Sequence, residues 1–253
     1  MATQVAVNYR LRPKYYEKLL FLFETYAVGD PHLTRSEIAQ LQADEQALYS
    51  ITPAQDANTM SRLCANLPGM RDLGRKPVIT DGCACVGGNV MSFALSGAYA
   101  QVNAVEFDES RARMLEHNVN VIRGRAPCTV NIVTGSYIAL MHTLSQDIVF
   151  LDPPWGGTDY ENGESVKLEL GGKTVTDIIE YLENSSHTQL VFWKAPEINY
   201  DEHDMNTQMS GLGLTMNEVT GFRKMKLFYV NLRVTAAEAS QDICSQCELT
   251  ASL

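Results

Sequence analysis

Residues 147–160 read DIVFLDPPWGGTDY. The first part, DIVFL, is a short apolar run rich in β-branched and aromatic residues and is bounded by prolines and glycines. This pattern predicts a buried strand that ends abruptly. Asp152 then lies at the carboxyl end of the strand, where ligands bind in open α/β sheets, because the strand ends face the crevice between the covering helices.

The turn after this strand is suited to hold a planar ligand that carries an amine. Pro153 and Pro154 remove two backbone donors and stiffen the loop, so their carbonyl oxygens stay free to accept hydrogen bonds. Trp155 adds a large flat ring beside Gly156 and Gly157, which permit close approach. The structural alternative is an ordinary Pro/Gly turn whose tryptophan belongs to the core.

Composition sets the broad class of the protein. With 253 residues, of which 45% are hydrophobic, the chain can form one large domain or a domain with an appendage. No apolar run has the length of a membrane span, and the first residues lack the apolar block of a signal peptide, so we expect no membrane association and a nuclear or cytoplasmic protein. The net charge of −10 argues against a protein that coats long nucleic acid, although it permits recognition of a short terminus.

The six cysteines are irregularly spaced and are predicted to be free thiols. Cys244 and Cys247 form a lone CxxC pair, which is weak support for zinc because no second ligand pair accompanies it. We therefore predict no metal site.

The first 75 residues are predicted to form a helical extension. Aromatic and leucine residues recur at helical spacing over 14–27 and again over 36–50, where Thr34 and Ser36 are candidate caps. A third helix is expected to begin at Thr52 and Pro53 and to end near Pro68.

Residues 76–237 alternate between strand and helix patterns, and residues 238–253 are predicted to form a loosely ordered tail. The alternation predicts a parallel sheet with helices on both faces. An antiparallel hairpin with a turn at Gly221 is expected to close the sheet. The predicted strands cover 78–81, 101–107, 128–135, 147–152, 188–196, 213–221 and 224–234, and the predicted helices cover 90–97, 108–122 and 174–184.

Two features before the Asp152 turn indicate a nucleoside. The glycine-rich turn over 81–89, DGCACVGGN, joins a strand to a helix, as close approach of a nucleoside or phosphate to backbone amides requires. Glu106 ends the next strand, about twenty residues on, where a carboxylate can hold both ribose hydroxyls. These features fit NAD or S-adenosylmethionine. The DPPW string favours S-adenosylmethionine, because hydride transfer has no use for a proline-fixed acceptor there.

Three motifs in this order, DGCACVGGNVMSFAL, AVEFDES and FLDPPWGGTDY, resemble those of the RNA cap guanine-N2 methyltransferases, the trimethylguanosine synthase family. The resemblance extends over roughly residues 10–235 and includes KYY at 14–16, Phe23 and SITP at 50–53. It implies an α/β class I methyltransferase (Rossmann-like) domain with a seven-stranded, mostly parallel sheet, an antiparallel terminal hairpin and an N-terminal helical extension.

The resemblance also implies a function for each part of the site. The catalytic group would be Asp152, Pro153, Pro154 and Trp155, with Trp155 stacked on 7-methylguanine. The residues implied to hold S-adenosylmethionine, whose product is S-adenosylhomocysteine, are Phe23, Thr52, Pro53, Asp81, Cys83, Val86, Gly87, Gly88, Asn89, Glu106, Phe107, Ser136, Tyr137 and Asp152. The residues implied to bind the cap are Lys14, Trp155, Tyr160, Pro196, Lys224 and Lys226.

The chain departs from the family pattern at four positions. Cys85 replaces a glycine of the first turn, and Ser136 stands where an aspartate usually contacts adenine. Glu197 follows Pro196 where a phosphate-binding arginine is expected, and Asp152 replaces a serine of some members.

The function implied is methylation of the exocyclic N2 amine of 7-methylguanosine in RNA 5′ caps, with capped RNA as partner and a monomeric enzyme. The number of methyl groups added stays open. Two alternatives remain. A DNA adenine-N6 or ribosomal-RNA guanine-N2 methyltransferase would share DPPW, but should show a basic groove or a target-recognition domain. A cap-binding module with an inactive cofactor site is the non-enzymatic alternative.

Overall fold

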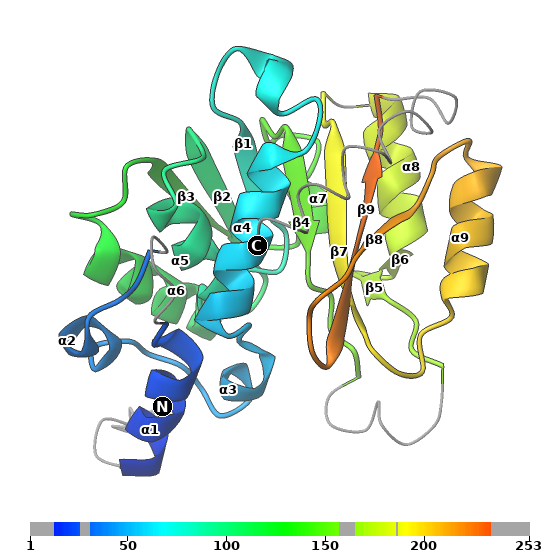
Figure 1. Ribbon diagram of the computed structural model, residues 1–253. Helices are drawn as coiled ribbons and strands as arrows, with labels where there is room; N and C mark the ends of the chain where they lie inside the picture. The colour runs from blue at the N-terminus through cyan, green and yellow to red at the C-terminus, as the bar shows by residue number, and fades with distance from the viewer. Residues whose placement is uncertain (1–12, 26–30, 157–164, 186, 234–253) are drawn as a thin grey trace, which may run out of the picture.

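The computed structural model describes residues 13–25, 31–156, 165–185 and 187–233. Their main feature is a seven-stranded sheet with the order β3-β2-β1-β4-β7-β9-β8 (Figure 1). The strands are β1 Val78–Asp81, β2 Gln101–Glu106, β3 Thr129–Thr134, β4 Ile148–Leu151, β7 Leu190–Pro196, β8 Asn217–Val219 and β9 Met225–Asn231.

The strand directions confirm the predicted fold class. Neighbouring strands from β3 through β2, β1 and β4 to β7 run parallel, whereas β9 is antiparallel to both β7 and β8. The predicted terminal hairpin is thus β8 and β9. The parallel strands place their carboxyl ends at one edge of the sheet.

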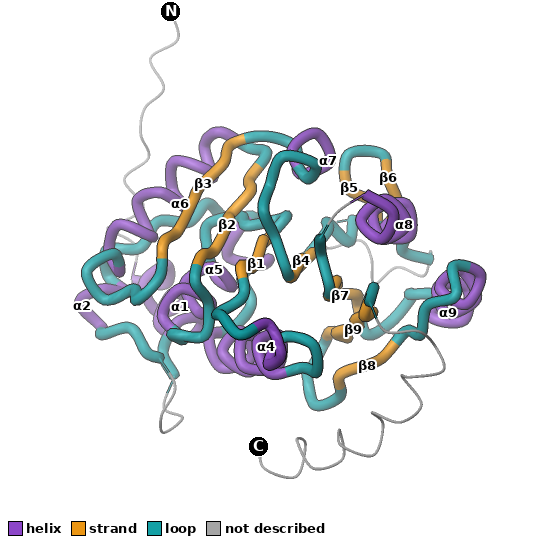
Figure 2. The backbone as a smooth tube through the Cα atoms, turned by 90° about the horizontal axis from the view of Figure 1, so that it is seen from above, coloured by secondary structure: helices purple, strands orange, loops and turns teal. Residues whose placement is uncertain are grey.

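Helices cover both faces of the sheet (Figure 2). Alternate residues of the central strand β4 explain this, since Ile148 and Phe150 join one buried cluster and Val149 and Leu151 the other. The first cluster contains residues of α4 Ala54–Asn66, α5 Gly88–Leu95 and α6 Glu109–Ile122, and the second contains residues of α7 Tyr137–Leu140, α8 Val175–Ser185 and α9 Glu202–Gly211.

The helical segment before the sheet differs from the prediction in one place. α1 Pro13–Phe23 and α4 lie near their predicted positions, but the single helix expected over 36–50 is wrong. Two short helices, α2 Arg35–Ile38 and α3 Ala47–Ser50, form instead, and α2 is capped by Thr34 rather than Ser36.

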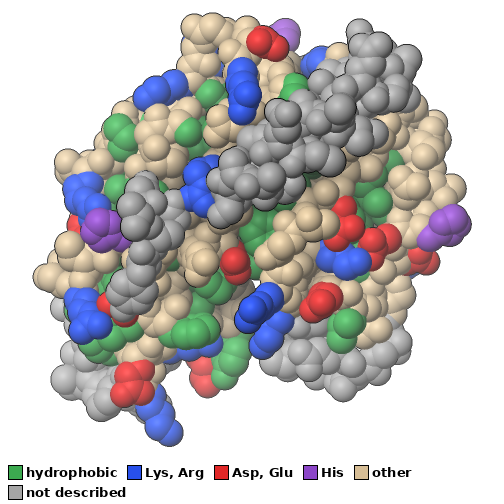
Figure 3. Space-filling view, viewed as in Figure 1, with side chains coloured by type: hydrophobic (Ala, Val, Ile, Leu, Met, Phe, Trp, Pro, Cys, Tyr) green, Lys and Arg blue, Asp and Glu red, His purple; other side chains and the backbone are tan. Residues whose placement is uncertain are grey.

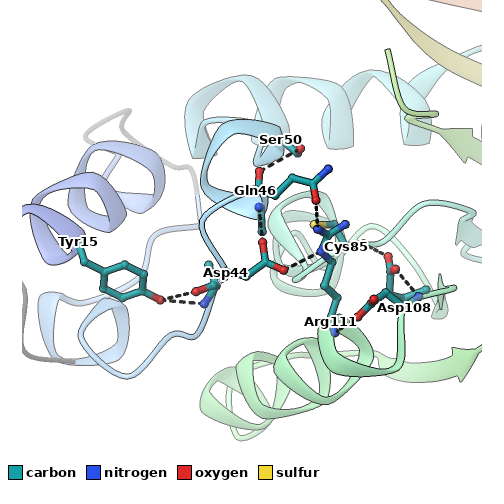
Figure 4. A network of polar contacts seen from close by, with 10 residues as sticks. Tyr15, Asp44, Gln46, Ser50, Cys85, Asp108 and Arg111 are labelled. Carbon is teal, nitrogen blue, oxygen red and sulfur yellow. Dashed lines mark hydrogen bonds and ion pairs between the residues drawn. The ribbon is translucent and has the colours of Figure 1, made fainter. Parts of the chain in front are cut away.

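Contacts with α6 explain the break between α2 and α3. The Asn118 side chain pairs with the backbone N–H and C=O of Gln42, at 2.7 and 2.8 Å. Arg111 donates to Asp44 Oδ2 at 2.8 Å and to Gln46 Oε1 at 2.6 Å (Figure 4). These tertiary bonds hold the backbone in a conformation that a continuous helix would not allow.

The segment before the sheet and the sheet share one buried cluster, to which Leu19 of α1, Met60 of α4 and Phe150 of β4 all contribute. The division of the chain at residue 75 stays a prediction. The CxxC pair, the expected tail and Tyr160 lie outside the described residues.

Three elements were not predicted, namely α7, α9 and a small hairpin of β5 Glu169–Leu170 and β6 Lys173–Thr174. A 3₁₀ turn also covers Arg71–Leu73. In the part of the chain that the structure describes, none of the helices has the length and apolar character needed to cross a membrane.

Asn118→Ala is expected to destabilise the protein by roughly 2–4 kcal/mol, because Asn118 is fully buried and the change orphans three backbone groups, on Gln42 and Val86. Urea denaturation measures the change. The matched control is His117→Ala, which removes one exposed contact to the Gln40 carbonyl and should cost less than about 1 kcal/mol. Equal losses in the two variants would contradict the proposed anchoring role of Asn118.

Candidate functional site

The site lies at the carboxyl ends of β1, β4 and β7, which are neighbours in the sheet. Asp81 is the last residue of β1, Asp152 follows β4 directly, and Lys194 lies within β7. Because Leu151 pairs with Trp193 in the sheet register, the next residues of the two strands, Asp152 and Lys194, also lie side by side. The topology thus brings three charged side chains to one edge.

Asp81 is a buried carboxyl group, and only one of its two oxygens has a hydrogen-bond partner among the described residues. It is 1% exposed, and its Oδ1 accepts from the Cys83 amide at 3.0 Å. Among the described residues, Oδ2 has no hydrogen-bond partner. Desolvation by burial raises the pKa of Asp81 from 3.8 to about 7, and the nearby negative charges of Asp152 and Glu106 add to the shift. Such a group is suited to receive a cation or a strong donor.

Glu106 lies at the end of β2, as the sequence indicated. Its Oε2 accepts from the Cys85 amide at 2.7 Å and its Oε1 from the Asp108 amide at 2.8 Å. These two bonds fix the carboxylate, and each oxygen keeps a second lone pair for a ligand donor. This geometry is compatible with the prediction that Glu106 accepts hydrogen bonds from the ribose hydroxyls.

Cys85, the residue that departs from the glycine pattern, has a left-handed backbone with φ 48°. That conformation favours glycine, so the backbone of the turn keeps the shape that a glycine would give it. Burial raises the pKa of the Cys85 thiol to about 12, with a further contribution from Glu106. A thiol nucleophile at this position is therefore not expected at neutral pH.

The helical segment before the sheet also reaches the site. Thr52, just before α4, is 4% exposed and its Oγ1 accepts from Lys194 Nζ at 2.9 Å. A Cβ atom on Gly88 would lie 3.1 Å from the Ile51 side chain, so a larger residue there would require Ile51 to shift, and glycine lets the first turn of α5 pack closely against residues 51 and 52. Phe23 is buried and lines a small cavity together with Gly88 and Ala54.

Trp155 has features of both alternatives. Its ring is half-buried and packs against both hydrophobic clusters, as a core residue would. It also lies beside the charged group, with Lys194 Nζ 5.6 Å from the ring centroid. Pro153 is buried and Pro154 is exposed.

The other predicted site residues have different surroundings. Val86 and Asn89 are buried in the glycine turn, and the Asn89 Oδ1 has no partner among the described residues. Phe107 is 77% exposed. Ser136 caps α7, while Tyr137 is buried in the second cluster with its hydroxyl near Gln146.

The predicted phosphate-binding residues are dispersed over several elements. Lys14 in α1 and Lys224 before β9 are exposed, whereas Lys226 in β9 forms an ion pair with Glu202, which raises the pKa of the lysine. Pro196 is buried at the end of β7, and Pro53 caps α4. On the face drawn in Figure 3, basic and acidic side chains are interspersed.

Lys194, on which Thr52, Asp152 and Trp155 converge, was not predicted from the sequence as a site residue. A lysine inside the otherwise apolar strand sequence LVFWKAP was the available signal, because the central strands of a parallel sheet rarely bury a charge without a partner. Across the described ranges, no group of three or more His, Cys, Asp or Glu side chains is arranged to hold a metal ion.

The raised pKa of Asp81 predicts an unusual dependence of stability on pH. The folded state holds this proton more tightly than the unfolded state, so the free energy of unfolding should fall as pH rises from about 4 to about 7, by at most about 4 kcal/mol. Asp81→Asn should remove this part of the dependence. Chemical denaturation at a series of pH values measures it, with the exposed Asp72→Asn as control. Parallel curves for wild type and Asp81→Asn would contradict the assignment.

Comparison with known proteins identifies relatives of this chain. Residues 76–196 match the sequence pattern of the RNA cap guanine-N2 methyltransferase family. The uncharacterized protein L320 of Acanthamoeba polyphaga mimivirus is 28% identical over 188 residues, which cover 68% of this chain and 72% of that protein. The trimethylguanosine synthase of Schizosaccharomyces pombe is 28% identical over 128 residues, and this match covers 49% of each chain, about half the length of that relative.

Solved structures show the same fold. A class I S-adenosylmethionine-dependent methyltransferase from Listeria monocytogenes, described as putative, superposes with a TM-score of 0.54 at 12% identity, covering 78% of this chain and 66% of that one. A precorrin-6y C5,15-methyltransferase from Geobacter metallireducens gives a TM-score of 0.51 at 12% identity, covering 76% and 93%. The strand order and these superpositions show that the chain has the class I methyltransferase fold, and residues 76–196, just under half of the chain, are similar to the RNA cap guanine-N2 methyltransferase family.

Proposed function

We propose that the protein transfers a methyl group from S-adenosylmethionine to the exocyclic N2 amine of 7-methylguanosine in RNA 5′ caps, in the nucleus or cytoplasm. The observation that carries the proposal is the Asp152–Trp155 turn, which follows β4 directly at the carboxyl edge of the sheet, next to the glycine turn. A carboxylate, proline carbonyls and an indole ring in succession suit a flat base that carries an amine.

The residues of the glycine turn fit S-adenosylmethionine. Two buried oxygens, Asp81 Oδ2 and Asn89 Oδ1, have no partner among the described residues and could accept from donors of this cofactor. Glu106 would hold the ribose, while Thr52 and Phe23 would approach from the helical segment. When bound, the cofactor supplies a methyl group on a sulfonium, whose thioether is an excellent leaving group.

The task of the protein's own residues is to orient the amine. The lone pair of the guanine amine is delocalised into the ring, so the amine is a weak nucleophile. Hydrogen bonds from the amine to Asp152 and to the Pro153 carbonyl would localise that pair and aim it. Asp152 Oδ2 is engaged by Lys194 at 2.5 Å, and among the described residues no hydrogen bond reaches Oδ1, which is the oxygen left for the amine.

Trp155 would provide the preference for a methylated cap. A guanine methylated at N7 carries a positive charge, and stacking it on an indole ring contributes roughly 1–2 kcal/mol in a desolvated site. Because the Lys194 ammonium already lies over the ring, we propose that the cationic base uses the opposite face. The exposed Lys14 and Lys224 are proposed to bind the cap phosphates. Lys226 is paired with Glu202, so it could bind a phosphate only if its ammonium contacted both groups.

The enzyme is expected to methylate m7GDP and to leave GDP, GTP and adenine oligonucleotides almost unmodified. Mass spectrometry of the four substrates after incubation with enzyme and cofactor measures the products and counts the methyl groups added. Asp152→Asn is the matched variant, since it keeps the side-chain shape but weakens both the bond of Oδ2 to Lys194 and the proposed bond of Oδ1 to the amine, and turnover should fall by a factor on the order of 10². Methylation of adenine or of unmethylated guanosine would instead favour the alternative methyltransferases, and cap binding without turnover would favour the binding module.

Trp155→Ala should raise the dissociation constant for m7GDP by a factor of about ten or more and abolish the preference over GDP. The ring also packs against both clusters, so a loss of stability of about 2–4 kcal/mol is expected as well. Fluorescence titration and thermal unfolding separate the two effects. Trp155→Phe retains a flat, weaker ring and should give intermediate affinity with affinity for the cofactor unchanged. If the preference for m7GDP survives in Trp155→Ala, the ring does not select the methylated base.

A further inference from the structure

Lys194 is the most unusual residue of the site, and the proposed function assigns it no role of its own in methyl transfer. Its side chain is 4% exposed, although a lysine is rarely buried without a specific partner. Removing an ammonium from water carries a desolvation penalty of several kcal/mol, which only well-placed partners offset. The surroundings of Nζ must therefore explain why the residue is there.

Three segments far apart in the sequence meet at Lys194 Nζ. The ammonium donates to Asp152 Oδ2 at 2.5 Å and to Thr52 Oγ1 at 2.9 Å, and lies 5.6 Å from the Trp155 ring centroid. The carboxyls of Asp81 and Asp56 also lie near: burial raises the pKa of both, and the positive charge of Lys194 opposes part of that rise. Lys194 is thus the cation of a predominantly acidic site.

The ion pair also determines the net charge at position 152, where the resemblance implies a serine in some family members. A lone carboxylate in place of a neutral hydroxyl would add a negative charge beside the substrate and could rotate toward any nearby cation. Paired with Lys194, it adds no net charge. The net charge of the pair is therefore zero, as it is for a serine hydroxyl, and Oδ1 of Asp152 is still a strong hydrogen-bond acceptor.

We propose that Lys194 is a positioning residue for methyl transfer, which fixes Asp152 through Oδ2 so that Oδ1 faces the substrate amine, and which ties Thr52 to the same site. This inference rests on the proposed function, because it assigns the orientation of its acceptor. It concerns the geometry of Asp152 and not the binding of the cofactor. A purely structural ion pair would instead affect stability alone.

A double-mutant cycle separates these possibilities, using Lys194→Met, Asp152→Ser and the double variant, with the exposed Lys173→Met as control for the substitution itself. Each single variant leaves one buried charge without its partner, so kcat should fall at least about tenfold. The dissociation constant for S-adenosylmethionine, measured by calorimetry, should rise by a smaller factor than kcat falls, because the pair orients the acceptor for the amine and affects the cofactor only through Thr52 and Asp152. The double variant should be more active than Lys194→Met, because serine needs no counter-ion.

Two results would overturn the inference. One is a kcat for Lys194→Met within about threefold of wild type. The other is a double variant whose loss equals the product of the two single losses, since the two residues would then act independently. Lys194→Gln, which keeps a donor and removes the charge, provides a smaller perturbation if Lys194→Met does not fold, and its kcat should also fall with cofactor binding retained.

The failure of the proposed function would be distinguishable from failure of this inference. If wild type methylates a guanine or adenine substrate other than m7GDP, the cap assignment fails, and the same cycle on that substrate still tests Lys194. If wild type binds the cofactor but methylates none of the substrates, both proposals fail.

Discussion

Charge buried at the carboxyl edge of three adjacent parallel strands is the constraint on which the site depends. Asp81, Asp152 and Lys194 end up there because β1, β4 and β7 are neighbours and run in the same direction. Away from water, each charge needs a partner or must give it up. Lys194 and Asp152 form an ion pair, whereas Asp81 keeps one oxygen without a hydrogen-bond partner among the described residues, and burial raises its pKa to about 7. The unsatisfied oxygen belongs to the predicted cofactor site, and the satisfied pair lies where the amine is expected.

The helical segment before the sheet takes part in this arrangement. Its Thr52 accepts a hydrogen bond from the central lysine, and its Ile51 side chain packs so closely on Gly88 that a Cβ added there would lie 3.1 Å from it. Farther away, two side chains of α6 hold the turns between α2 and α3. Asn118 bonds to the backbone of Gln42, and Arg111 bonds to Asp44 (Figure 4). The position of Thr52 therefore depends on side-chain bonds made along α6, since these hold the segment on the sheet.

The sheet could be predicted from sequence because its strands are short apolar runs bounded by glycine, proline and acidic residues. The order of the motifs then placed Asp81, Glu106 and Asp152 at strand ends, and the structure has them there. Tertiary contacts were not accessible in this way. Bonds from α6 break the helical pattern of residues 36–50, and α9, EHDMNTQMSG, has too weak an apolar periodicity to be recognised. Lys194 was missed because its partner is 42 positions away and only the register brings the two together.

The buried pair has a consequence for how such a site can diverge. Starting from a neutral serine at position 152, a lineage that acquires the aspartate first must tolerate an uncompensated carboxylate. One that acquires the lysine first has a buried ammonium whose remaining hydrogen bond, within the part of the chain that the structure describes, is to Thr52. Either intermediate is costly, by several kcal/mol for a buried charge without a counter-ion. We expect the two positions to change together among relatives, so that the residue facing β4 from β7 indicates which acceptor a family member presents to its substrate.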